Sequence, residues 1–263
     1  MARRRTEKVV TTTWEAGTSV RRPDEVIVEE PLEIRLDDVL VATTMRTPGH
    51  DFELAVGFCL TEGLLGDARV QSCRYCATGS AVTTEFNVVS VDTGGRAPTP
   101  TPRLGPATSS CGLCGSATLE QLGDRLPPLA DPRPPALDVL AEVPERVRAM
   151  QPLFDKTGSV HAAAAFDASG VPLVVREDIG RHNAVDKVVG KLLLDGKLPA
   201  EGHGLYVSGR ASFELVTKAW AAGFPALVAV SAPSALAVAT ADRAGILLAG
   251  FARHGRLNVY RPR

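Results

Sequence analysis

The chain has 263 residues, of which 44% are hydrophobic and 22% charged, and its formal net charge is −1. A chain of this length buries roughly 70 to 75% of the surface that it exposes when unfolded, which is enough for one large domain or two unequal ones. The composition therefore excludes a fold that depends on disulfide bridges, and the near-neutral charge leads us to expect no nucleic acid partner.

The N-terminus is basic, as at the start of a signal peptide, because Met1 and Ala2 are followed by three arginines. However, Thr6, Glu7 and Lys8 stand where an apolar segment would begin. No run of residues approaches the roughly 18 apolar residues of a membrane span. We therefore expect a cytoplasmic protein without a membrane partner.

The first part of the chain is expected to form strands around one helix. Period-two alternation predicts strands in four ranges, 25–30, 32–36, 39–44 and 81–91. The first three give a three-stranded start. Residues 51–61 place Leu54 and Cys59 on one helical face before Gly63, which predicts a helix with a buried thiol. We expect a smaller β-rich N-terminal domain over residues 1–93.

A proline- and glycine-rich tract follows from Gly94 to Pro106, with no apolar periodicity. If extended as polyproline II, it spans on the order of 35 Å at about 3.1 Å per residue. A second proline-rich patch covers residues 127–135. We expect residues 94–143 to form a linker and a mobile arm.

That arm carries two thiols, Cys111 and Cys114, in a C-x-x-C motif among glycines and serines. Such a pair can hold a metal, cycle as a disulfide or carry sulfur. Thioredoxin-like exchange is disfavoured because the pair follows a proline tract instead of opening a helix in a βαβ unit. Sulfur carriage needs a lowered thiol pKa or a base from a partner, because a free cysteine of pKa about 8.5 is only about 3% thiolate at pH 7.

Zinc is the main alternative for these thiols. The chain has five cysteines, and Cys73 and Cys76 form a second C-x-x-C pair. Four thiolates make a structural zinc set, although the 34-residue gap between the pairs is longer than in the familiar pattern. The odd cysteine count and the paired spacing favour a reducing compartment.

Residues 144–263 are expected to form an α/β domain with a mainly parallel sheet covered by helices. A hairpin is predicted over 160–166 and 172–175, with later strands at 205–208, 227–230, 246–251 and 257–260. Helices are predicted at 144–156, 181–194, 212–222 and 234–244. Ligands of such sheets bind beyond the carboxyl ends of the strands.

Three strand exits at this edge are candidate phosphate contacts: Ser208-Gly209-Arg210-Ala211-Ser212, Ser231-Ala232-Pro233-Ser234, and Phe251-Ala252-Arg253-His254-Gly255-Arg256. Each alone is equally consistent with plain helix capping or a solvated turn. Residues 201–263 carry seven Lys and Arg against three Asp and Glu, so an anionic ligand is expected towards the C-terminus. Before the helix at 181, Asp178 is a candidate cap and His182 a candidate donor, while Lys187 is read as an anion contact or a solvated residue.

Four segments in this order resemble the FdhD family of formate dehydrogenase accessory proteins: Ser109 to Gly115, Arg176 to Lys187, Ser208 to Ala219, and Gly250 to Arg256. The resemblance runs from about position 45 almost to the end. It implies a sulfur carrier that takes sulfur from a cysteine desulfurase and passes it to the molybdenum bis(molybdopterin guanine dinucleotide) cofactor of formate dehydrogenase. It also implies a homodimer, and no permanent cofactor is expected.

The resemblance further assigns roles to residues. It implies that Cys111 carries the persulfide and that Cys114 is its partner thiol. It places cofactor binding on Phe251, Ala252, Arg253, His254, Gly255 and Arg256, and we add Ser208, Gly209, Arg210 and His182 as neighbouring contacts.

The family's C-terminal domain is similar to the cytidine deaminase fold, which implies a three-layer domain. Deamination itself is excluded, because His161-Ala162-Ala163 lacks the glutamate of the H-x-E motif and no cysteine follows Cys114. The alternative function is a non-catalytic, cofactor-binding chaperone stabilised by zinc on Cys73, Cys76, Cys111 and Cys114.

Overall fold

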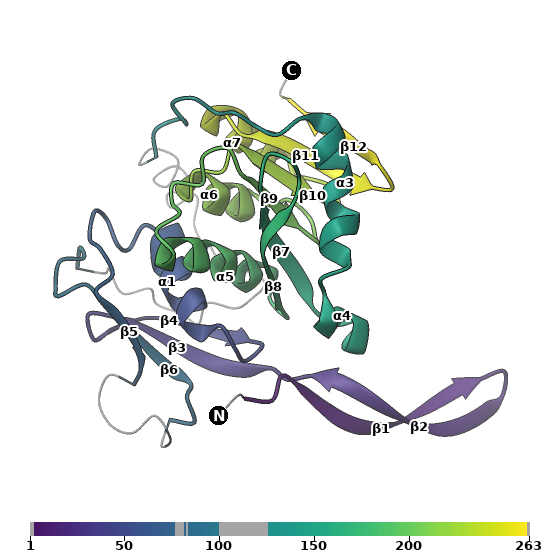
Figure 1. Cartoon of the computed structure of the whole chain (residues 1–263). Helices are drawn as coiled ribbons and strands as arrows, with labels where there is room; N and C mark the ends of the chain where they lie inside the picture. The colour runs from purple at the N-terminus through teal and green to yellow at the C-terminus, as the bar shows by residue number, and fades with distance from the viewer. Residues whose placement is uncertain (1–2, 77–81, 83, 100–125, 262–263) are drawn as a thin grey trace.

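A computed structural model describes residues 3–76, 82, 84–99 and 126–261 of the chain (Figure 1). The described strands form three sheets of two, four and six strands. Cys111 and Cys114, with most of the predicted arm, lie outside the described residues.

The two-stranded sheet is a hairpin of β1 (Thr6–Glu15) and β2 (Thr18–Ile27) that extends from the body of the molecule (Figure 1). Ala16 and Gly17 join the strands with positive φ values of 48° and 85°, as in the two-residue turns whose twist suits hairpins. Of this hairpin, only a strand at 25–30 was predicted. The rest was missed because both faces of the hairpin are largely exposed, so no alternation of apolar and polar residues marks it.

The four-stranded sheet has the order β4-β3-β6-β5 and is covered by α1 (Asp51–Thr61). Its strands are β3 (Glu30–Leu36), β4 (Val39–Arg46), β5 (Ser72–Tyr75) and β6 (Val88–Asp92). The predictions for 32–36, 39–44 and the helix are confirmed, and Cys59 is fully buried as expected. The strand predicted at 81–91 begins only at Val88, because Glu85 and Phe86 turn the chain with positive φ.

The six-stranded sheet has the order β12-β11-β10-β9-β7-β8. Its strands are β7 (His161–Phe166), β8 (Pro172–Asp178), β9 (Gly204–Val207), β10 (Ala226–Ala229), β11 (Leu247–Arg253) and β12 (Arg256–Tyr260). Only β9, β10 and β11 are mutually parallel, so the mainly parallel sheet that we predicted is wrong. Tight turns join β7 to β8 and β11 to β12, and strands joined in this way pair antiparallel.

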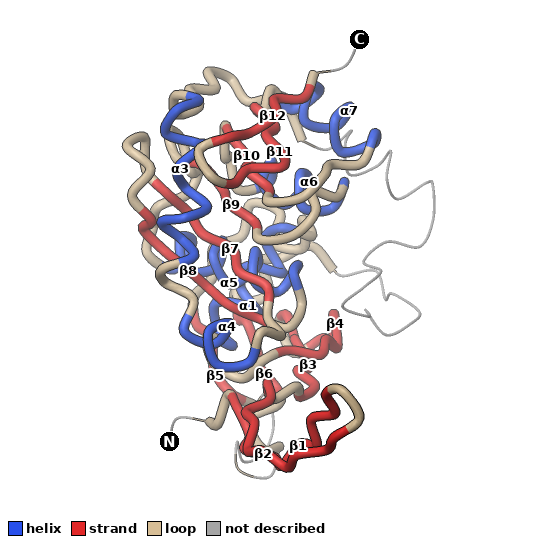
Figure 2. The backbone as a smooth tube through the Cα atoms, turned by 90° about the vertical axis from the view of Figure 1, so that its right-hand side faces the viewer, coloured by secondary structure: helices blue, strands red, loops and turns tan. Residues whose placement is uncertain are grey.

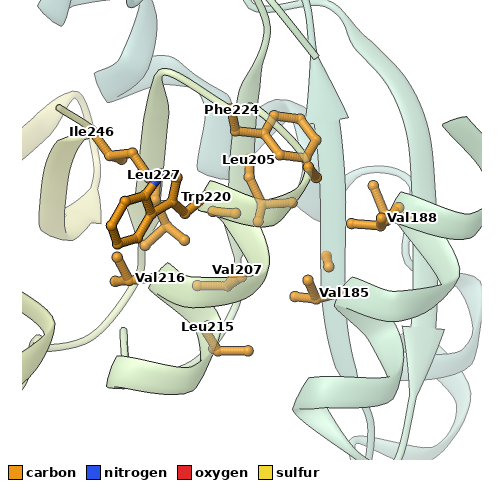
Figure 3. Packing of buried hydrophobic residues seen from close by; sticks show 14 of the residues in the cluster. Val185, Val188, Leu205, Val207, Leu215, Val216, Trp220, Phe224, Leu227 and Ile246 are labelled. Atoms are coloured by element: carbon orange, nitrogen blue, oxygen red, sulfur yellow. The ribbon is translucent and has the colours of Figure 1, made fainter. Parts of the chain in front are cut away.

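Helices cover both faces of this sheet, which confirms the predicted three-layer arrangement. On one face lie α5 (Arg181–Leu194), α6 (Phe213–Ala221) and α7 (Ala235–Ala244), and on the other α3 (Leu137–Arg148) (Figure 2). The larger core lies between the sheet and α5 to α7, where Val188, Leu205 and Trp220 pack together (Figure 3). A smaller core holds Leu140 and Val143 of α3 against Phe166.

The segment before the sheet differs from the expectation. α3 begins at Leu137, so residues 137–143 belong to a packed helix and not to a linker. The helix predicted at 144–156 is two helices, because α3 ends at Arg148 and α4 (Pro152–Thr157) begins after a break. Upstream, the Trp220 Nε1 donates to the Pro127 carbonyl at 2.8 Å, which ties the second proline-rich patch to the body.

Among the residues that the structure describes, none of the helices has both the length and the apolar character needed to cross a bilayer.

Candidate functional site at the strand-end edge

The three predicted strand exits meet at one edge of the six-stranded sheet. The Ser231 N–H donates to the Gly209 carbonyl at 3.2 Å, and the Ser234 N–H donates to the Ala211 carbonyl at 3.1 Å. The Phe251 N–H in turn donates to the Ser231 carbonyl at 3.2 Å. These backbone bonds place the ends of β9, β10 and β11 side by side, as parallel strands require.

The third exit differs in form from the prediction. β11 does not stop at Phe251 but continues to Arg253, with an irregularity after Gly250 where Phe251 has a φ of 51°. His254 and Gly255 then form a tight turn with positive φ, and Arg256 pairs back across it with Arg253. The predicted cofactor segment is therefore the tip of a hairpin.

A cavity of about 710 Å³ lies beside this tip, between the sheet and the α3–α4 region. Its volume falls in the range of pockets that hold one drug-sized ligand. Of the predicted site residues, Ser208, Ala252, Arg253 and His254 line it. Gly209, Arg210, Phe251, Gly255 and Arg256 lie on the adjacent turns and are not part of its lining.

Two contacts hold the cavity wall in place. The backbone N–H of His254 donates to the Glu145 Oε1 at 2.6 Å, which anchors the hairpin tip to α3. The Ser208 Oγ accepts from the Ala162 N–H at 2.9 Å, so its oxygen is fixed by β7. The Arg253 side chain is exposed, so its guanidinium is free to approach an anion at the mouth.

Sequence reasoning missed the aromatic and polar part of the lining. The Arg148 guanidinium lies 4.8 Å from the centroid of the Phe154 ring, a cation–π arrangement at the cavity wall. Gln151 is buried, and burial raises the pKa of Tyr206 to about 12. Phe154 falls within the helix predicted at 144–156, and no motif marks any of these residues.

His161, at the start of β7, is a further lining residue that we had considered only for deamination. Burial lowers its pKa, and the nearby charges of Arg181 and His182 lower it further. A methyl group on Gly209 would lie 3.6 Å from the imidazole, so the ring rests against the first strand exit. The imidazole is therefore predominantly neutral at pH 7 and above, and its unprotonated ring nitrogen can accept a proton there.

The structure places His182 apart from the cavity lining. Its Nε2 lies 2.7 Å from the Glu214 Oε2, a contact that joins the first turns of α5 and α6. His182 still influences the cavity, because it is one of the charges that lower the pKa of His161.

Asp178 and Lys187 form a buried ion pair, with 2.6 Å between the Lys187 Nζ and the Asp178 Oδ2. The Lys187 Nζ also donates to the Thr47 carbonyl at 2.9 Å. Lys187 is thus neither an anion contact nor a solvated residue, and both readings were wrong. The Asp178 Oδ1 accepts from the Gly180 N–H at 2.8 Å, so it does organise the turn that enters α5.

Burial disfavours the thiolate form of Cys59 and Cys73. Burial raises the pKa of Cys73 to about 12, and burial also raises the pKa of Cys59 well above its usual range. Cys76 is buried, and its Sγ lies 3.0 Å from the Thr84 Oγ1. In ranges 3–76, 84–99 and 126–261, no group of three or more His, Cys, Asp or Glu is arranged to hold a metal.

Comparison with known proteins identifies the family. The model of the FdhD/NarQ family matches residues 27–263. A sulfur carrier protein FdhD of Mycolicibacterium paratuberculosis is 50% identical over 252 residues, covering 93% of both chains. One of Streptomyces avermitilis is 49% identical over 253 residues, covering 93% of this chain and 89% of the relative.

A solved structure shares the fold. A candidate formate dehydrogenase accessory protein of Desulfotalea psychrophila is 24% identical, with a TM-score of 0.75 and 98% of each chain covered. The family match includes the strand-end edge and the hairpin tip, and with the near 50% identity of the relatives it establishes the relationship. The chain belongs to the FdhD/NarQ family.

Proposed function

We propose that this protein is a sulfur carrier that serves the maturation of formate dehydrogenase. The observation that carries the proposal is the near 50% identity, over almost the whole chain, to proteins named sulfur carrier protein FdhD. The Cys111 motif and the strand-end edge both lie within the matched range.

In this proposal Cys111 carries the sulfur. Its thiolate attacks the outer sulfur of a persulfide on a cysteine desulfurase, so that a Cys111 persulfide forms and the donor leaves as a thiolate. The described thiols support this choice indirectly, because Cys59 and Cys73 are held protonated by burial and are weak nucleophiles. Cys114 can then attack the inner sulfur of the persulfide, which closes a disulfide and releases hydrosulfide.

The acceptor in this proposal is the molybdenum bis(molybdopterin guanine dinucleotide) cofactor, bound as substrate at the strand-end edge. The cavity suits one nucleotide arm of such a ligand, because it pairs an apolar wall at Phe154 and Tyr206 with polar groups at Ser208 and Arg253. Arg253 and the basic hairpin tip supply the charge that a pyrophosphate requires. The remainder of the ligand would extend beyond the cavity.

The protein is further proposed to act in the cytoplasm as a homodimer. A reducing compartment suits a carrier whose thiols must be regenerated.

The test is restoration of formate dehydrogenase activity in cells that lack their own carrier. Wild-type protein and Cys73→Ser should restore activity, and Cys111→Ser should restore none. A Cys111→Ser variant that restores full activity would contradict the proposal. Equal protein levels must be verified by immunoblot.

The zinc-stabilised chaperone is the alternative function, and metal analysis separates the two. Stoichiometric zinc in the purified protein, lost on both Cys73→Ser and Cys111→Ser, would favour the chaperone. If the protein is a sulfur carrier, we expect any bound zinc to be substoichiometric. The zinc content should also be unchanged by Cys73→Ser, since burial keeps that thiol protonated.

A further inference from the structure

In the hairpin arm of β1 and β2, β1 packs extensively only on β2 among the described helices and strands, whereas β2 also contacts α4. Within the described residues these strands pair only with each other, and Figure 1 shows them extending from the body. In β1, Val10 at mid-strand is 64% exposed and Trp14 near the turn is 71% exposed. A two-stranded hairpin alone is marginally stable in water, so an arm of this length is expected to gain stability from a further contact.

The two edges of the arm differ in chemistry. Strand β2 carries four charged residues on the two sides of a proline: Arg21 and Arg22 precede Pro23, and Asp24 and Glu25 follow it. Charges and proline are the usual means by which proteins prevent pairing at a sheet edge. In β1, by contrast, residues 9–14 read Val-Val-Thr-Thr-Thr-Trp, with no charge and no proline. Such a segment favours strand pairing, so the edge of β1 is the open one.

The hydrogen-bond pattern of the hairpin shows which groups of β1 are available. A two-residue turn makes its flanking pair, Glu15 and Thr18, a hydrogen-bonded pair, and such pairs alternate along the ladder. The Val28 N–H donates to the Arg5 carbonyl at 2.9 Å, which fits the same alternation at the base of the arm. The even-numbered residues of β1 therefore direct their backbone N–H and C=O groups outward.

We propose that the open edge of β1 pairs antiparallel with β1 of a second copy of this chain, with the two-fold axis at Thr12. A hydrogen-bonded ladder between the two copies of β1 can form only in registers that place even-numbered residues opposite even-numbered residues. With the axis at Thr12, Val10 of each copy lies opposite Trp14 of the other copy. Each of these two cross-strand pairs joins an aromatic and a β-branched side chain, and it covers both from solvent. An axis at Thr11 would instead oppose Glu7 and Glu15, which repel each other.

The arm contact is independent of the sulfur chemistry. The family match begins at residue 27, the last residue of β2, so the arm precedes the segment that defines the family. The oligomeric state can therefore be tested apart from sulfur transfer. A monomeric wild type would remove the homodimer but leave the proposed sulfur chemistry in place, and failure of sulfur loading would leave the arm contact in place.

The first test compares two proline variants by analytical ultracentrifugation of the full chain. Thr12→Pro removes an outward N–H from β1, whereas Arg21→Pro removes one from β2 at the same level of the hairpin, since Thr12 and Arg21 are cross-strand partners. We expect wild type and Arg21→Pro to dimerise and Thr12→Pro to be monomeric. Trp14→Ser should raise the dimer dissociation constant about tenfold or more. A monomeric wild type, or a dimer that survives Thr12→Pro, would overturn the proposal.

A second test does not depend on the folding of a proline variant. Thr12→Cys places two thiols across the proposed axis, at a hydrogen-bonded pair whose Cα atoms are about 5.5 Å apart, a separation that a disulfide spans. Mild oxidation should give a disulfide-linked dimer through position 12, identified by peptide mass. Arg21→Cys is the matched control and should give no such link. Equal cross-linking of the two variants would refute the pairing of β1 edges.

Discussion

Gly57 of α1 and Gly190 of α5 lie against each other where the helix of the N-terminal sheet crosses the first helix of the C-terminal sheet. A methyl group on Gly57 would lie 1.9 Å from the Asp186 carbonyl oxygen, and one on Gly190 would lie 1.8 Å from the Glu53 carbonyl oxygen. Both contacts are with helix backbone, which cannot yield as a flexible side chain can. The two sheets are therefore held together by a helix crossing that only glycine permits.

Gly190→Ala should lower the free energy of unfolding by about 3 kcal/mol, because the added methyl forces the helices apart. The corresponding fall in Tm is about 6 to 10 °C for a chain of this size. Gly209→Ala is the matched control, since its methyl would approach no atom closer than 3.6 Å. Calorimetric melting curves check both, and a Gly190→Ala protein that melts with wild type would contradict the crossing.

The C-terminal half was predicted closely because its central strands are buried apolar runs and its helices bury one apolar face. The helix at Arg181–Leu194 was placed without error, and the strands β9 and β10 within one residue. Strand direction was not predictable from the alternation of strands and helices alone. It is set by the turns at 167–171 and 254–255, which make two edge pairings antiparallel.

The candidate site was only partly accessible from sequence. Ser208 and Arg253 were found because glycine-rich strand exits mark them. Glu145 and Phe154 were not, because they approach the cavity only through the packing of α3 and α4 on the sheet. Likewise, the contact between His182 and Glu214 joins residues of two helices that lie 32 positions apart in the sequence, and no local pattern encodes such a contact.

Glu53 and Arg176 form a bidentate ion pair between α1 and β8, with 2.5 Å and 2.8 Å between their atoms. Burial opposes ionisation of Glu53, but hydrogen bonds from Arg176 and His50 prevail and lower its pKa to about 2. A depressed carboxyl pKa contributes stability above the unfolded value near 4.5, and this contribution is lost as the pH falls towards 2.

Glu53→Gln should therefore lower the unfolding free energy by about 2 kcal/mol at pH 7, allowing for partial solvent screening. The difference from wild type should shrink between pH 4.5 and 2. Urea unfolding at several pH values measures it. A difference that stays constant over this interval would show that the ion pair is not its source.

His161 should make the free energy of unfolding depend on pH below about 6.5. Burial lowers its pKa below 6.5, so the folded state prefers the neutral ring, and stability declines as the pH falls from 6.5 through the folded pKa. His161→Gln should remove this part of the decline while leaving the unfolding free energy at pH 8 nearly unchanged. Parallel pH profiles for variant and wild type would contradict the assignment.

The cavity prediction concerns guanine nucleotides. Arg253→Ala should weaken the binding of guanosine diphosphate about tenfold, because it removes a charge-assisted contact at the cavity mouth. Phe154→Ala should weaken it by a similar factor through loss of the apolar wall, and Arg256→Ala by less, about threefold. Isothermal titration calorimetry measures the three, with Arg261→Ala as a control outside the edge. Unchanged affinity of both Arg253→Ala and Phe154→Ala would place the nucleotide elsewhere.

Sulfur loading tests the central claim most directly. The protein is incubated with a cysteine desulfurase and cysteine, treated with an alkylating agent, and digested for peptide mass spectrometry. We expect one added sulfur atom on the peptide that contains Cys111, absent in Cys111→Ser and retained in Cys73→Ser. An active desulfurase that leaves Cys111 unmodified, or that loads Cys73 instead, would contradict it.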